Sequence, residues 1–121
     1  MDFLLNLFGQ RVPSLDPQEA QKRLSASPRP FLLDVRQPDE FKQAHIQGAK
    51  LIPLADLPGR LHELPKGHEI LCVCASGSRS QSAARRLVKA GYQAANIQGG
   101  MTRWIGAGLP VQRPKEPKSK K

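Results

Sequence analysis

The chain has 121 residues, of which 39% are hydrophobic and 24% are charged, and its formal net charge is +9. This length and composition suit one globular domain with one buried core. The apolar segment at residues 1–9 is short and carries an acid where a signal peptide has basic residues, so it predicts neither a signal peptide nor a membrane span. Two cysteines without a signal peptide indicate a reducing compartment, and we expect a cytoplasmic location.

The positive charge is divided between the body of the chain and its C-terminal tail. Residues 113–121, RPKEPKSKK, contain five basic residues and one acidic residue, so they supply +4 and leave +5 on the rest. The tail is rich in Pro and Lys, and we expect it to be disordered. The body lacks the interleaved aromatic residues of nucleic-acid-binding surfaces, which argues against a specific nucleic-acid partner and favours small anionic substrates.

The first predicted elements alternate between helix and strand. Residues 1–12 form an apolar segment, which we expect to be a short helix packed on the body or a frayed end, with a membrane-touching or dimerising segment as the alternative. Asp16, Pro17 and Glu19 form a helix-start pattern, because an acidic cap, a first-turn proline and a nearby acid all favour helix initiation. The continuous β-prone run at 31–36 predicts a buried strand.

The remaining elements continue this alternation. We expect a short helix at 38–45, a short strand at 49–54, a broken helix at 54–64, a central strand at 68–75, a helix at 78–92, a strand at 93–99 and a short helix at 100–108. The pattern predicts an α/β fold with a mainly parallel central sheet and helices on both faces. Such folds place their sites at the carboxyl ends of strands. No internal repeat is visible, so we expect one domain over 13–112 and, by default, a monomer.

The sequence around Cys74 carries the strongest chemical signal. The apolar run at 70–74 predicts a strand that ends at this cysteine, and the short loop after it leads into a helix. The first amides of the helix and its dipole place partial positive charge at the loop, where small residues let backbone N–H groups turn inward as an anion-binding nest. A cysteine in such a place has a lowered pKa and is nucleophilic. We therefore predict Cys74 as the catalytic residue and a substrate-binding loop of Ala75, Ser76, Gly77, Ser78, Arg79 and Ser80.

Cys72 is interpreted as a buried, unreactive residue. It lies two residues before Cys74 on the same strand, so both side chains leave from one face. That spacing gives poor disulfide geometry. Metal binding does not fit either, because the chain has no second cysteine pair and no cluster of its three histidines. We expect neither a metal nor a cofactor.

Four segments resemble the rhodanese (sulfurtransferase) family. CASGSRS at 74–80 resembles the active-site loop, and LLDVRQPDEFKQAHIQGAKLIPL at 32–54 resembles the first signature of the family. IQGGMTRW at 97–104 and GLPV at 108–111 resemble its closing segments. One departure is Ala44, where the family more often has Gly. The resemblance covers about residues 13–111, nearly the whole chain.

The resemblance implies a sulfurtransferase that works by double displacement. The Cys74 thiolate would take a sulfur from a small anionic donor such as thiosulfate, and the resulting persulfide would pass it to cyanide or a thiol. A carrier that delivers persulfide sulfur to a protein partner is an alternative. A phosphatase or arsenate reductase of the same fold is disfavoured, because those enzymes have one more residue between the Cys and the Arg than the four found here. A non-enzymatic interaction module is a weaker alternative, because such rhodanese domains lack the cysteine.

Charged residues around the loop allow further predictions. Arg79 is expected to attract the anionic end of the donor and to favour the thiolate, and the alternative is an ion pair with Asp34 or another acid. Arg36 and Glu40 are four residues apart across a helix start and are predicted to pair. Asp34 is expected to brace the loop. His45 is expected to be a satisfied core or loop-bracing residue.

Overall fold

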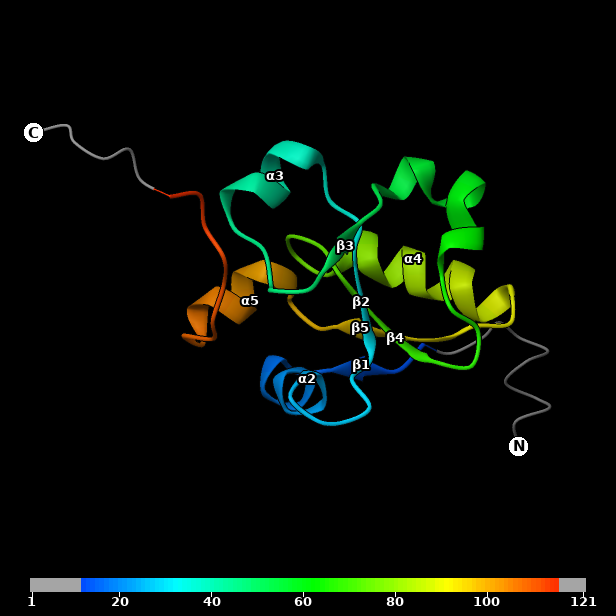
Figure 1. Cartoon of the computed structure of the whole chain (residues 1–121), viewed down its shortest axis with the longest axis horizontal. Helices are drawn as coiled ribbons and strands as arrows, with labels where there is room; N and C mark the ends of the chain where they lie inside the picture. Colours follow the sequence, from blue (N-terminus) through cyan, green and yellow to red (C-terminus); the bar gives the residue numbers. More distant parts are fainter. Residues whose placement is uncertain (1–11, 116–121) are drawn as a thin grey trace, which may run out of the picture.

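The computed structural model describes residues 12–115 as a five-stranded parallel sheet with helices on both faces (Figure 1). The strand order is β1-β5-β4-β2-β3, so β4 lies in the middle. This architecture confirms the α/β class. The strands are β1 (Ser14–Leu15), β2 (Phe31–Asp34), β3 (Lys50–Leu51), β4 (Glu69–Val73) and β5 (Gln93–Ile97).

The helices lie between successive strands and after the last one. They are α2 (Pro17–Leu24), α3 (Pro38–Gln43), the 3-10 segment η1 (Leu54–Glu63), α4 (Ser78–Lys89) and α5 (Gly100–Gly106). The predicted order of elements is confirmed, and η1 is broken as expected, with a non-helical backbone at Arg60. Strand β1 was not predicted, because two residues are too few to show a periodicity. The predicted tail and apolar segment lie outside the described residues, apart from Val12 and residues 113–115.

Alternation along β4 sends its side chains into two separate cores. Ile70 and Cys72 belong to the core between the sheet, α4 and η1, whereas Leu71 and Val73 belong to the core with α2 and α5. Figure 1 shows α4 and η1 on one side of the sheet and α2 on the other. Because β4 is buried on both faces, its end is held firmly, and the loop that follows it has a fixed starting point.

Two helix ends show how local sequence determines the fold. The carboxylate of Asp16 accepts a hydrogen bond of 2.8 Å from the N–H of Glu19, which confirms the predicted cap of α2. Ala44 follows α3 with φ −167° and ψ 136°, an extended conformation open to any residue. The departure from the family's Gly therefore imposes no strain at this position.

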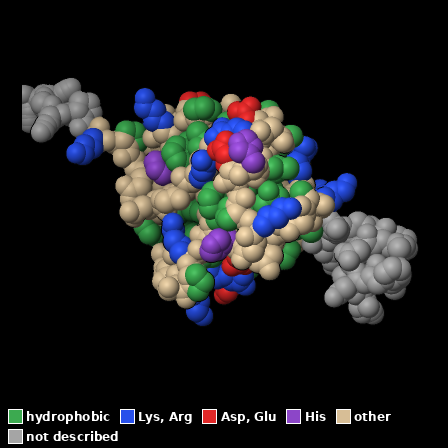
Figure 2. Space-filling view, turned by 45° about the vertical axis from the view of Figure 1, so that its right-hand side comes forward, with side chains coloured by type: hydrophobic (Ala, Val, Ile, Leu, Met, Phe, Trp, Pro, Cys, Tyr) green, Lys and Arg blue, Asp and Glu red, His purple; other side chains and the backbone are tan. Residues whose placement is uncertain are grey.

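The surface carries the charge excess seen in the sequence. Figure 2 shows Lys and Arg side chains spread over the visible face, with fewer Asp and Glu among them. Within residues 12–115, no helix is both long enough and apolar enough to cross a membrane.

Candidate active site

Cys74 lies directly after β4, at the carboxyl end of the middle strand. The loop from Cys74 to Gly77 leads into α4, and Gly77 is the residue before the first turn of that helix. Cys74 has no exposed surface, whereas Ser76 and Ser78 are exposed. The predicted arrangement of strand, tight loop and helix is confirmed, and the cysteine lies on the inner side of the loop.

The Sγ atom of Cys74 is surrounded by hydrogen-bond donors. The N–H of Gly77 donates to it at 3.1 Å and the N–H of Ser80 at 3.2 Å, and the Ser80 hydroxyl oxygen lies 3.3 Å away. Burial acts to raise the pKa of Cys74, but the hydroxyl of Ser80, when it donates to the anionic sulfur, and the N–H groups of Ser80, Gly77 and Ser76 together lower this pKa below its ordinary value. The loop therefore favours an anionic sulfur.

The predicted loop residues do not all contribute in the same way. Gly77 has φ +104°, and a Cβ there would lie 3.0 Å from the backbone nitrogen of Gly99, so this turn requires glycine. In the loop as described, Ala75, Ser78 and Arg79 make no hydrogen bond to the sulfur. Their predicted roles in substrate binding remain predictions.

The Gly-Gly segment at the start of α5 supports the loop from behind. The N–H of Met101 donates to the carbonyl of Cys74 at 2.8 Å, and the N–H of Thr102 donates to the carbonyl of Ala75 at 3.0 Å. Gly100 has φ +58°, and a Cβ on it would overlap the Cys74 carbonyl oxygen and lie 2.6 Å from that of Ala75. The sequence identified this segment by resemblance alone, whereas the structure gives it a supporting role.

Arg79 points to α3 and makes no hydrogen bond to the sulfur. Its guanidinium forms a two-pronged ion pair with Glu40, with Nη1–Oε1 at 2.8 Å and Nη2–Oε2 at 2.9 Å. This is the alternative in which Arg79 pairs with an acid. The hydrogen bonds from Arg79 lower the pKa of Glu40 from its ordinary 4.5 to about 2.

The predicted pair between Arg36 and Glu40 is wrong. Arg36 pairs with Asp34, with Nη2 2.8 Å from Oδ2, and reaches only the backbone carbonyl of Glu40. Asp34 and Arg36 are two residues apart in extended chain at the end of β2, so their side chains leave from the same face. The Glu40 carboxylate instead accepts hydrogen bonds from the N–H of Gln37 and from Arg79. Asp34 therefore braces the segment around α3, through Arg36, instead of the cysteine loop.

His45 and Cys72 have the structural roles predicted for them. The His45 ring stacks on Phe41 at 3.9 Å, and its backbone pairs with Gln112. Cys72 has no exposed surface, and burial, with a smaller effect from Cys74, raises its pKa to about 12. Both cysteines are free. Cys72 therefore stays protonated at neutral pH.

Asn96 of β5 is a neighbour that sequence reasoning missed. The Ser80 hydroxyl donates to its Oδ1 at 2.6 Å, and only 3% of Asn96 is exposed. The only signal for this residue in the sequence was its polar side chain within the predicted strand at 93–99. That signal alone did not indicate a contact between Asn96 and the cysteine loop.

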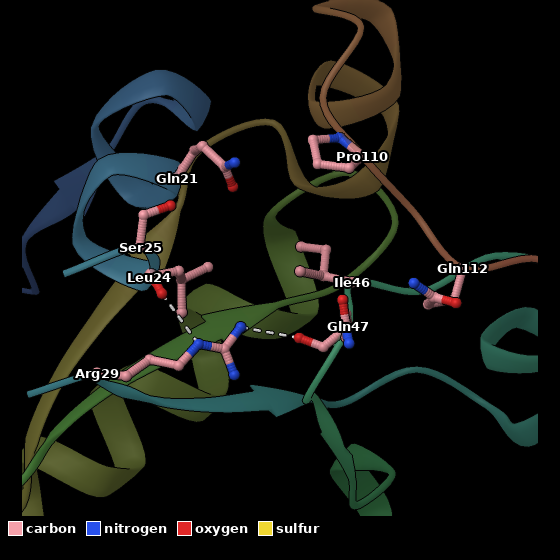
Figure 3. A pocket seen from close by; sticks show the side chains of 8 residues that line it. All are labelled: Gln21, Leu24, Ser25, Arg29, Ile46, Gln47, Pro110 and Gln112. Carbon is pink, nitrogen blue, oxygen red and sulfur yellow. Dashed lines mark hydrogen bonds between the residues drawn. The ribbon is translucent and has the colours of Figure 1, made fainter. Parts of the chain in front are cut away.

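A cavity of about 230 Å³ lies elsewhere, against α2 (Figure 3). Arg29 lines it and donates to the carbonyls of Leu24 and Gln47 at 3.0 and 2.8 Å. The other lining residues, Gln21, Ser25, Ile46, Pro110 and Gln112, include no cysteine, histidine or acid. Across residues 12–115, no group of three or more His, Cys, Asp or Glu residues could hold a metal ion. Cys74 is therefore the candidate reactive centre.

The ion pair of Arg79 and Glu40 gives a pH prediction. Because the pKa of Glu40 is lowered in the folded state, the pair stabilises the fold above pH 4.5 and loses this effect as pH falls toward about 2. Both side chains are about one-third exposed, so we expect Glu40→Gln to lower the unfolding free energy at pH 7 by only about 1 kcal/mol. Urea unfolding at pH 7 and pH 2.5 measures the difference, which should shrink at the lower pH. An equal loss at both values would contradict the assignment.

Comparison with known proteins agrees with this geometry. The Rhodanese-like domain family model matches residues 16–107. A sulfurtransferase of Allochromatium vinosum is 34% identical over 104 residues, covering 85% of this chain and 97% of that protein. YrkF of Bacillus subtilis, named as a candidate sulfur carrier, is 34% identical over 96 residues, covering 78% of this chain and 52% of YrkF. The crystal structure of a rhodanese-like domain protein from Staphylococcus aureus superposes with a TM-score of 0.76 at 33% identity, covering 84% of this chain and 99% of that one. The chain therefore belongs to the rhodanese-like domain family.

Proposed function

We propose that this protein is a sulfurtransferase that moves a sulfane sulfur from thiosulfate or a related donor to a thiophilic acceptor through a persulfide on Cys74. The observation that carries the proposal is the buried Cys74 sulfur with the N–H groups of Gly77 and Ser80 within 3.2 Å. Donors fixed by the backbone stabilise negative charge without reorganising. The same donors suit a thiolate before the reaction and a persulfide anion after it.

The reaction needs no general base at the cysteine. The Cys74 thiolate attacks the outer sulfur of thiosulfate, a new S–S bond forms, and sulfite leaves with the electron pair of the broken bond. Cyanide or a thiolate then attacks the outer sulfur of the persulfide, and Cys74 leaves as the thiolate. The hydrogen bonds of the loop stabilise the Cys74 thiolate, which is the nucleophile in the first step and the leaving group in the second.

Arg79 is proposed as the side chain that attracts the donor. About one-third of its side chain is exposed, and it lies next to the exposed Ser78 at the outer side of the loop. A guanidinium has five N–H donors, so the two hydrogen bonds to Glu40 leave others for an oxyanion. Only four residues lie between Cys74 and Arg79, and this short loop suits a single sulfur atom better than a phosphate group.

A persulfide carrier is the second candidate, supported by the similarity to YrkF. In that case the chemistry at Cys74 is the same, and the acceptor is a protein thiol. A cytoplasmic, monomeric protein without a cofactor, as expected from the sequence, is compatible with either function. The two candidate functions differ in which sulfur donor and which sulfur acceptor react fastest with Cys74.

Loading with thiosulfate tests the proposal. We expect the reduced protein mixed with thiosulfate to gain the mass of one sulfur atom on Cys74, and cyanide to remove it. The loaded protein should also melt at a higher temperature, because the persulfide anion uses hydrogen bonds that exist only in the folded loop. Intact mass spectrometry and a thermal melt measure both effects. A gain only from a persulfidated protein donor would favour the carrier, and no gain from any donor would contradict both candidates.

A further inference from the structure

A buried hydrogen-bond chain runs from the reactive sulfur to β5. The hydroxyl oxygen of Ser80 lies 3.3 Å from Cys74 Sγ and 2.6 Å from Asn96 Oδ1. Cys74 and Ser80 have no exposed surface, and Asn96 is 3% exposed. The three residues come from the loop, from α4 and from β5, so they meet only in the folded protein.

The hydroxyl of Ser80 has one proton, and it cannot donate to both neighbours at once. The distance of 2.6 Å to Asn96 Oδ1 requires a hydrogen between the two oxygens, and a carbonyl oxygen cannot supply it. The Ser80 proton therefore lies toward Asn96. In this arrangement Ser80 can only accept a hydrogen bond from the sulfur, which suits a protonated Cys74.

An anionic sulfur requires the opposite direction. A thiolate or persulfide only accepts hydrogen bonds, so Ser80 must turn its proton toward the sulfur. If the Asn96 amide turns over, its Nδ2 takes the place of Oδ1 and donates to the Ser80 oxygen. Among the described residues, the bond from Ser80 is the one side-chain hydrogen bond that holds this amide, so turning it breaks no other such contact there.

We propose that Asn96 is a positioning residue whose amide turns over when Cys74 becomes anionic, and so directs the Ser80 hydroxyl at the sulfur. Asn96 makes no hydrogen bond to the sulfur and acts through Ser80. The proposal rests on the proposed function only in that Cys74 works as an anion. The hydrogen bond from Ser80 to an anionic sulfur is charge-assisted, and a donor bound to the Ser80 oxygen strengthens it further, because linked hydrogen bonds polarise each other. Removing the amide should therefore weaken the anionic state more than the neutral one.

A neutral replacement at position 96 separates this effect from the charges near the loop. Asn96→Leu changes no charge and keeps the number and branching of the side-chain heavy atoms, while it removes both the donor and the acceptor. The charged and titratable groups on the elements around Cys74 stay as they are, among them Asp34 at the end of β2, Arg36 after it, Glu40 of α3, Cys72 of β4, Arg79 of α4 and Arg103 of α5.

The test follows iodoacetamide alkylation of Cys74 against pH, located by mass spectrometry. We expect the pH at which the alkylation rate is half-maximal to be higher in both variants. At the wild-type midpoint, the alkylation rate should be lowered about threefold in Asn96→Leu and about tenfold in Ser80→Ala. The double variant should match Ser80→Ala alone, because Asn96 acts only through Ser80. Gln93→Leu, the same chemical change at an exposed position of β5, should leave the midpoint unchanged.

Each other outcome overturns the proposal. A midpoint moved to lower pH in Asn96→Leu would mean that Asn96 competes with the sulfur for the Ser80 proton. An unchanged midpoint would mean that Asn96 only fills space. If the leucine variant does not fold in a thermal melt, Asn96→Ala removes the same amide without adding volume, and the same shift is required of it. Alkylation uses no sulfur donor, so failure of thiosulfate loading would leave this measurement intact.

Discussion

Replacing Cys74 by serine is expected to lower sulfur transfer by about a thousandfold or more, equal to about 4 kcal/mol of activation free energy. A serine hydroxyl is not ionised at neutral pH, so it lacks the charge that the loop stabilises. The fold should remain, because the hydroxyl oxygen can accept the hydrogen bonds that the N–H groups of Gly77 and Ser80 now give to the sulfur. Thiosulfate turnover and intact mass after loading measure the loss.

Cys72→Ser is the matched control for this variant. It makes the same chemical change two residues earlier along the chain, where the side chain is fully buried and is assigned no role in the reaction. We expect it to keep its sulfur-transfer rate while losing about 1–3 kcal/mol of unfolding free energy, because a hydroxyl is placed in an apolar core. An active Cys74→Ser together with an inactive Cys72→Ser would show that the wrong cysteine had been assigned.

Gly100→Ala is expected to be the most damaging change outside the loop itself. The added Cβ would overlap the carbonyl oxygen of Cys74, and the residue would keep a φ of +58° that side chains rarely adopt. Strain and overpacking together should lower the unfolding free energy by about 3 kcal/mol. Because Met101 and Thr102 donate to the loop carbonyls, any shift that relieves the overlap should also displace Cys74 and reduce sulfur loading.

Gly106→Ala provides the comparison within the same helix. A Cβ at Gly106 would meet no atom within 4 Å, and its φ does not lie in the left-handed range. We expect wild-type sulfur loading and an unfolding free energy that is unchanged or slightly higher. Urea unfolding and thiosulfate loading of the two variants make the comparison. Wild-type stability and loading in Gly100→Ala would contradict the supporting role of this segment.

Local signals in the sequence predicted those parts of the fold that depend on nearby residues. The cap at Asp16 and the strand, loop and helix around Cys74 are local features, and the structure confirms them. Strand β1 has two residues and exists only because β5 pairs with it, so no pattern along the chain could reveal it.

Contacts between distant segments were harder to predict. Glu40 and Arg79 are 39 positions apart, and Ser80 and Asn96 are 16 apart. Each pair forms only after the sheet brings its elements together. The error at Arg36 has the same origin, because helical spacing suggested Glu40 as its partner, while Glu40 is engaged by Arg79 from another helix.

The position of Cys72 has a consequence for oxidative damage. The chain contains two cysteines, and the second lies two residues away on the same buried strand, where a disulfide with Cys74 has poor geometry. A sulfenic acid condenses reversibly with a thiol, and redox-sensing cysteines often lie next to a resolving cysteine that supplies it. Here a sulfenic acid on Cys74 has no such partner within the chain, so its recovery depends on a thiol that comes from solution.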